Sequence, residues 1–148
     1  MDNKSSKTIN LIAIFVVVLY VVFSCFSCFE ITHISVINIE DTVLKEVVSV
    51  RAEHCNIPLA LFLAGIQCLL LFIGGRSYRI ASLICAIFMC FAVPVITVKR
   101  LLESTFASWG GLGYEEFDIT LFWYVVILLG ILNVIVQIVS LKKEGNEQ

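Results

Sequence analysis

Four uninterrupted apolar runs divide the chain. They cover residues 9–29, 57–74, 80–98 and 121–141, and none of them contains Asp, Glu, Lys or Arg. A helix of about 20 apolar residues rises roughly 30 Å, which matches the hydrocarbon core of a bilayer. The pattern therefore predicts four transmembrane helices. Because each such helix satisfies its own backbone hydrogen bonds, we expect an all-α four-transmembrane-helix bundle, with residues 1–148 as a single domain.

The connections between these spans differ in length. Residues 75–79 form a short inner loop, whereas residues 30–56 and 99–120 form outer loops. The first outer loop is rich in β-branched residues over 31–39 and is apolar again over 43–50. This composition favours a short β-hairpin, which would form a small extracytoplasmic cap over the bundle. The alternative is an amphipathic helix, because several apolar residues of the second half follow helical spacing.

The first run determines the orientation of the others. It is longer than the apolar region of a secretory signal peptide, about 7–15 residues, so we interpret it as a signal anchor. If all four runs cross the membrane, six of the ten Lys and Arg residues lie on the side of the N-terminus. The positive-inside rule then predicts that both termini are cytoplasmic.

Composition and charge agree with a protein of the cell membrane. Hydrophobic residues make up 59% of the 148 residues and charged residues 15%, whereas soluble domains contain about 45–50% apolar and 25% charged residues. Nine of the twelve acidic residues lie on the predicted outer side, which argues against nucleic acid as a partner. We expect the lipid bilayer as surroundings, and another membrane protein or a second copy of the chain as partner.

The most suggestive group of polar residues inside the predicted spans forms one stripe of the fourth. Its members are Gly130, Asn133, Gln137 and Ser140, which are spaced by three, four and three residues. Gln67 of the second span lies at a depth similar to that of Asn133, roughly 15–18 Å at about 1.5 Å per residue. An amide left alone in hydrocarbon costs several kcal/mol, so we predict that Gln67 and Asn133 hydrogen-bond across the bundle. The alternative is that the stripe lines a small channel or carrier.

Three cysteines lie near the outer ends of the first two spans. Cys25 and Cys28 form a C-x-x-C pattern, and Cys55 precedes the second span. Four spans with such a pair resemble the quinone-coupled disulfide-generating membrane enzymes, and the resemblance implies a thiol–disulfide oxidoreductase that uses Cys25 and Cys28. Those enzymes need a second outer cysteine pair, and residues 99–120 contain no cysteine. We therefore expect free thiols, or a structural disulfide that joins Cys55 to Cys28 or to Cys25.

Other catalytic and metal-binding patterns are missing from the sequence. His33 and His54 lie in the first outer loop with Cys55, but their spacing matches no familiar zinc motif. The spans contain no carboxylate, which a proton-coupled exporter would need. The sequence thus predicts a non-enzymatic membrane protein without cofactor or metal. We expect it to act through contacts, as an accessory subunit, a membrane organiser or an immunity-type protein.

Overall fold

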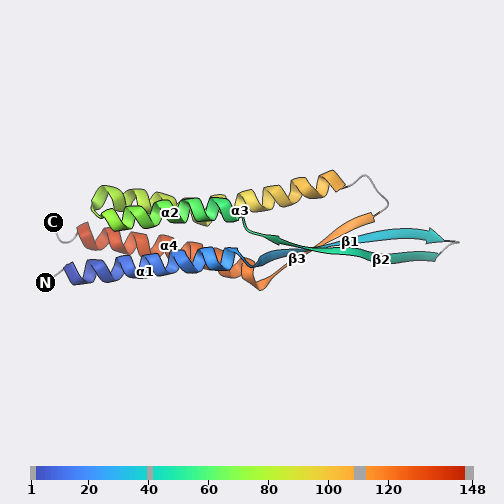
Figure 1. Cartoon of the computed structure of the whole chain (residues 1–148), viewed down its shortest axis with the longest axis horizontal. Coiled ribbons are helices and arrows are strands. Elements are labelled where there is room, and N and C mark those ends of the chain that lie inside the picture. Colours follow the sequence, from blue (N-terminus) through green and yellow to red (C-terminus); the bar gives the residue numbers. More distant parts are fainter. Residues whose placement is uncertain (1–2, 40–41, 109–112, 146–148) are drawn as a thin grey trace.

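The chain forms helices and the strands of one small sheet. The computed structural model describes the backbone of residues 3–39, 42–108 and 113–145, and the side chains of residues 8–35, 49–103 and 115–143. Over these residues the fold is mostly helical, with four helices and three strands (Figure 1). In chain order the elements are α1 (Asn3–Ser24), β1 (Ser27–Ile39), β2 (Thr42–His54), α2 (Ile57–Ile73), α3 (Arg76–Ser108), β3 (Gly113–Ile119) and α4 (Leu121–Gly145).

The four helices form a bundle from one end of which the sheet extends. α1 packs against α2 and α4, and α3 packs against the same two helices. Figure 1 shows both termini at the end of the bundle opposite the sheet. All three strands therefore join the bundle at the same end, and the sheet continues the long axis of the molecule rather than capping the helices.

α1 ends five residues before the end of the apolar run that predicted it. The predicted span reached Phe29, but the helix ends at Ser24, where Ser24 Oγ donates a hydrogen bond to Tyr20 O at 2.8 Å. A turn over residues 25 and 26 leads into β1. From there the backbone bonds to neighbouring strands instead, and Cys28 O accepts a hydrogen bond from Thr120 N at 3.1 Å. Strand pairing thus takes over the end of an apolar run that composition alone assigns to the membrane.

α2 begins and ends at the residues that the sequence favours. Leu59 N donates to Asn56 Oδ1 at 3.3 Å, so Asn56 caps the helix, and Pro58 occupies the first turn, where a missing N–H is harmless. Gly74 and Gly75 follow with φ of 75° and 94°, a left-handed conformation that glycine adopts without strain. α3 begins at Arg76, so the predicted inner loop 75–79 is shorter than expected and its last four residues are helical.

α3 is longer than predicted at both ends and passes through Pro94. Hydroxyl groups bond carbonyls on both sides of the proline: Tyr20 donates to Met89 O and Thr97 donates to Val93 O, each at 2.7 Å. The helix continues to Ser108, so residues 99–108 are not part of a loop. A Lys99–Glu103 ion pair at 3.7 Å has the i,i+4 spacing that supports a helix there.

β1 is the central strand of an antiparallel sheet with the order β2–β1–β3. It pairs with β2 from Ser27↔His54 to Ile39↔Thr42, which confirms the hairpin over the amphipathic helix. Each strand has 13 residues, so the hairpin is long rather than short. β3 lies in the predicted second outer loop and pairs with β1 from Phe29↔Ile119 to Ser35↔Gly113. The two predicted outer loops therefore form one structure.

Candidate functional site

The bundle buries polar side chains and exposes apolar ones. Buried polar residues are Ser24, Gln67, Arg79, Ser82, Thr97, Asn133, Gln137 and Ser140. Large apolar side chains are exposed along all four helices, and Phe72 reaches 86% exposure. This arrangement is the reverse of the burial preferences of soluble domains. Two helical segments, Arg76–Glu103 and Leu121–Lys143, are long and apolar enough to cross a membrane.

Gln67 of α2 and Asn133 of α4 bond to each other in the middle of the bundle. Gln67 Nε2 donates to Asn133 Oδ1 at 2.9 Å, and Asn133 Nδ2 donates to Gln67 Oε1 at 3.0 Å. Both side chains are fully buried. The predicted hydrogen bond is therefore present, and it is reciprocal. Interhelical bonds of this kind contribute about 0.6–2 kcal/mol each, and this pair connects two helices that lie diagonally across the bundle.

The rest of the predicted stripe also faces the bundle interior. Gly130, Gln137 and Ser140 are buried. Neither amide atom of Gln137 bonds a described residue, and the hydroxyl of buried Ser82 has no described partner either. The bundle interior thus contains one amide pair whose members bond each other, as well as an amide and a hydroxyl group that bond no described residue.

Arg79 is a member of this polar core that the sequence analysis missed. Its Nη1 donates to Ser140 Oγ at 2.9 Å and to Ser140 O at 3.3 Å, which links α3 to α4. The sequence analysis treated Arg79 only as an inner basic residue next to a span. Its spacing of three residues from Ser82 and seven from Ala86, both buried, places it on the same helix face and was the available signal.

The backbones of α3 and α4 approach each other closely in the sheet-side half of the bundle. A Cβ added to Gly130 would lie 3.2 Å from Cys90 Cα and 3.5 Å from Tyr20 Cε2. Gly130 thus lets α4 approach α3 more closely than a larger residue would allow. The Tyr20 hydroxyl bonds α3 at Met89 O, so three helices meet here.

Cys28 and Cys55 meet where the hairpin joins the helices. Their Sγ atoms are 3.1 Å apart and share a hydrogen bond, and both residues are buried. This hydrogen bond lowers the pKa of the Cys28 thiol and raises the pKa of the Cys55 thiol, and burial raises the latter further. Cys25 is exposed. The geometry therefore pairs Cys28 with Cys55, which agrees with one of the two predicted disulfide pairings, although both cysteines are present as free thiols.

Further contacts hold the base of the sheet against the bundle. Thr120, just before α4, donates its hydroxyl to Ser27 O at 2.6 Å. The Phe29 ring lies 4.6 Å from the Trp123 ring, measured between centroids. β1 is therefore attached to α4 by backbone, hydroxyl and aromatic contacts, next to the two cysteines.

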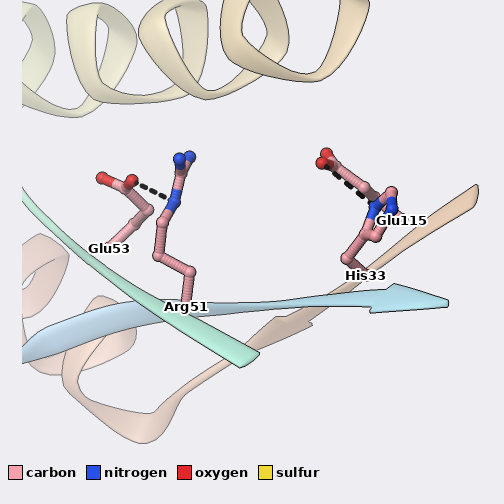
Figure 2. A network of polar contacts seen from close by, with 4 residues as sticks. All are labelled: His33, Arg51, Glu53 and Glu115. Atoms are coloured by element: carbon pink, nitrogen blue, oxygen red, sulfur yellow. Dashed lines mark ion pairs between the residues drawn. The ribbon is translucent and has the colours of Figure 1, made fainter. Parts of the chain in front are cut away.

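Charged pairs lie on the face of the sheet that is turned toward α3 (Figure 2). Arg51 Nε lies 2.9 Å from Glu53 Oε1, and His33 Nδ1 lies 3.8 Å from Glu115 Oε1. Within the described ranges no group of three His, Cys, Asp or Glu side chains could hold a metal ion. His33 lies in β1 and His54 is the last residue of β2.

Comparison with protein families, with curated proteins and with solved structures gave no match for this chain.

Proposed function

We propose that this protein is an integral membrane protein of four spans that acts through contacts outside the bilayer rather than through catalysis. The bundle serves as its anchor and the three-stranded sheet as its binding element. The partner is another membrane protein or a second copy of the chain. This role includes the accessory subunit, the membrane organiser and the immunity-type protein that the sequence favours.

Four crossings are supported by the way the helices pack. Two helices are long and apolar enough to cross a membrane, and α1 and α2 pack along them. α2 has 17 residues, which is the lower limit of about 17–25 for a crossing helix. On α1, Leu11 is 68% and Phe15 is 61% exposed, and lipid would cover such side chains. The positive-inside rule favours cytoplasmic termini, which places the sheet on the outer side.

The observation that carries the contact role is the open sheet. β2 and β3 are its two edge strands, and in the described part of the chain neither has a partner on its outer side. Edge strands present unpaired N–H and C=O groups, to which an extended segment of another chain can add. Val50 of β2 is 61% exposed and Ile119 of β3 is 52% exposed, so apolar side chains accompany these free edges.

The thiol oxidoreductase is the second candidate, and the observation that favours it is the Cys28–Cys55 contact of 3.1 Å. Its active pair would be Cys28 and Cys55 rather than the C-x-x-C pair. Cys25 remains exposed to exchange with an external disulfide. A single buried pair serves a structural bond at least as well, so we rank this function below the contact role.

Photo-crosslinking in intact cells tests the contact role. A photoreactive residue at Val50 should crosslink the chain to a discrete protein, either a second copy or another membrane protein. The same residue at Leu128, which is 64% exposed on α4, serves as the lipid-facing control and should not. A Val50 variant without any protein adduct would contradict the role of the sheet. Release of the protein from membranes by alkaline carbonate would contradict the four spans independently.

A further inference from the structure

A small polar cavity lies between the end of β2, the start of α2 and the sheet-side half of α3. Its volume is about 160 Å³, and its lining includes Arg51 and Glu53 of β2 and Thr97 and Arg100 of α3. At about 30 Å³ per liquid water molecule this space corresponds to roughly five waters, whereas sites for drug-sized ligands measure about 300–1,000 Å³. A compact polar group therefore fits the cavity better than a large metabolite.

Hydrogen bonds that involve no charged side chain fix one wall of this cavity. Asn56 N donates to Thr97 Oγ1 at 3.0 Å, and the same hydroxyl donates to Val93 O at 2.7 Å. Thr97 is only 5% exposed. Because Asn56 also caps α2, Thr97 ties the first turn of α2 to α3. The charged side chains can therefore be altered without removing the support of the cavity.

Two arginines give the cavity an excess of positive charge. Arg51 bonds Glu53 through Nε, and its terminal nitrogens lie on the side that faces α3 (Figure 2). The Arg100 side chain makes no ion pair or hydrogen bond with any residue that the structure describes. Two guanidinium groups and one carboxylate leave one positive charge in excess among the Arg and Glu residues that line the cavity. The N-terminus of α2, which also borders the cavity at Asn56, adds the positive end of a helix dipole.

We infer that this cavity binds one phosphate group, carried either by a lipid headgroup or by a small phosphate ester in solution. A phosphodiester carries a single negative charge, which matches the excess, and the planar guanidinium fork bonds two phosphate oxygens at once. The lipid source rests on the proposed four spans, because the start of α2 and residues 97–100 of α3, which lie side by side, are then at headgroup level. The solution source does not depend on them.

Glu53 distinguishes a binding site from a structural ion pair. If Arg51 and Glu53 only stabilise the sheet, loss of either side chain has the same consequence. If the cavity binds phosphate, the Glu53 carboxylate repels the ligand and also occupies Arg51. The variants Arg51→Gln and Glu53→Gln should therefore change phosphate binding in opposite directions.

The test uses the full chain purified in detergent. Calorimetric titration with inorganic phosphate measures the solution source. Native mass spectrometry with dioleoyl phosphatidylglycerol, compared with dioleoylglycerol, measures the lipid source. We expect Arg51→Gln and Arg100→Gln each to weaken binding about tenfold, because each removes a charge-assisted hydrogen bond. Glu53→Gln should strengthen it severalfold. Lys99→Gln is the matched control, since Lys99 pairs with Glu103 and does not line the cavity.

Each outcome has a defined meaning. This ranking with phosphatidylglycerol supports the lipid source, and the same ranking with inorganic phosphate alone supports the solution source. The inference is overturned if neither probe binds, if Lys99→Gln weakens binding as much as Arg100→Gln, or if Glu53→Gln weakens it. Should Arg51→Gln fail to fold, Arg100→Gln carries the test because it breaks no described contact. Carbonate extraction tests the four spans separately and does not involve these side chains.

Discussion

The amide pair at the centre of the bundle shows how a few polar residues can specify the packing of apolar helices. Lipid tails are as apolar as Leu and Val, so burial alone does not decide which helix faces meet in a membrane. Gln67 and Asn133 are fully buried and bond each other twice. Any rotation of α2 or α4 that separates them leaves two amides unsatisfied, which selects one arrangement of these helices.

This reasoning predicts the outcome of a double-mutant cycle. Gln67→Leu or Asn133→Leu leaves the other amide buried without its partner, and each should lower the free energy of unfolding by about 1–3 kcal/mol. The double variant should lose clearly less than the sum of the two losses. Unfolding in mixed micelles, followed by circular dichroism, provides the measurement. Additive losses would show that the two side chains do not depend on each other.

Gly130 allows a comparison between two glycines of the bundle. A Cβ at Gly130 would meet Cys90 Cα at 3.2 Å, whereas a Cβ at Gly65 meets nothing within 4 Å. Gly130→Ala should therefore lower the melting temperature, because α3 and α4 must separate by a few tenths of an ångström. Gly65→Ala should leave the melting temperature unchanged or raise it, because alanine is favoured over glycine inside a helix by up to about 1 kcal/mol. Equal effects of the two substitutions in thermal unfolding would contradict the close approach.

At the scale of elements, the sequence predicted the types of most segments better than their ends. Helical spacing and depth can be counted along the chain, which is why the Gln67–Asn133 pair was predicted. The ends of α1 and α3 depend on what the chain meets next. Ser27 to Phe29 are apolar or small enough for a span, yet they pair with β2 and β3. β1 and β2 are neighbours in the chain and left a local signal, whereas β3 is separated from β1 by α2 and α3, so nothing local in the sequence indicates that pairing.

The third strand left a weak signal in the sequence. Glu116, Phe117, Asp118 and Ile119 alternate polar and apolar side chains, the period of a half-buried strand. Asp118 pairs with Glu30 in the sheet. Arg79 was missed for a related reason: a charge at the end of an apolar run is normally assigned to a loop, whereas here it is buried and bonds Ser140.

The cysteine pair predicts how the sheet is fixed to the bundle under oxidising conditions. Diamide should convert the thiols of Cys28 and Cys55 to a disulfide, as two protons and two electrons pass to the diamide, which becomes the hydrazine. Closing this loop should raise the free energy of unfolding by about 3.6 kcal/mol in the chain-entropy view. Mass spectrometry of alkylated peptides measures the bond. Cys25→Ser should leave it intact, whereas Cys55→Ser should abolish it.

The pH dependence of this oxidation follows from the shared hydrogen bond. The bond lowers the pKa of the Cys28 thiol, so its reactive thiolate persists at a lower pH than in the unfolded chain, where a free thiol titrates near about 8.5. As pH falls, the oxidation rate of the folded protein should therefore decline at a lower pH than that of the urea-unfolded chain. The rates are measured by quenching the reaction with an alkylating reagent at successive times. If the folded and the unfolded protein show the same dependence of rate on pH, the shared hydrogen bond is contradicted.

For the molecule as a whole, the proposed four crossings would fix the sides on which its parts lie. The termini and the α2–α3 turn are at one end of the bundle and the sheet is at the other (Figure 1). Ser77 next to that turn and Glu116 on β3 are both exposed. In a Cys25→Ser background, a membrane-impermeant maleimide should label Glu116→Cys in intact cells. Ser77→Cys should be labelled only after lysis.

The labelling pattern distinguishes a reversed orientation of the helices from an absence of membrane crossings. Labelling of Ser77→Cys but not Glu116→Cys in intact cells would reverse the orientation while retaining the crossings, and the sheet would then meet cytoplasmic partners. Labelling of both positions in intact cells would mean that the helices do not separate the two ends of the molecule. In that case the exposed apolar side chains of α1 to α4 would need a protein surface rather than lipid to cover them, and the contact role would move from the sheet to the bundle.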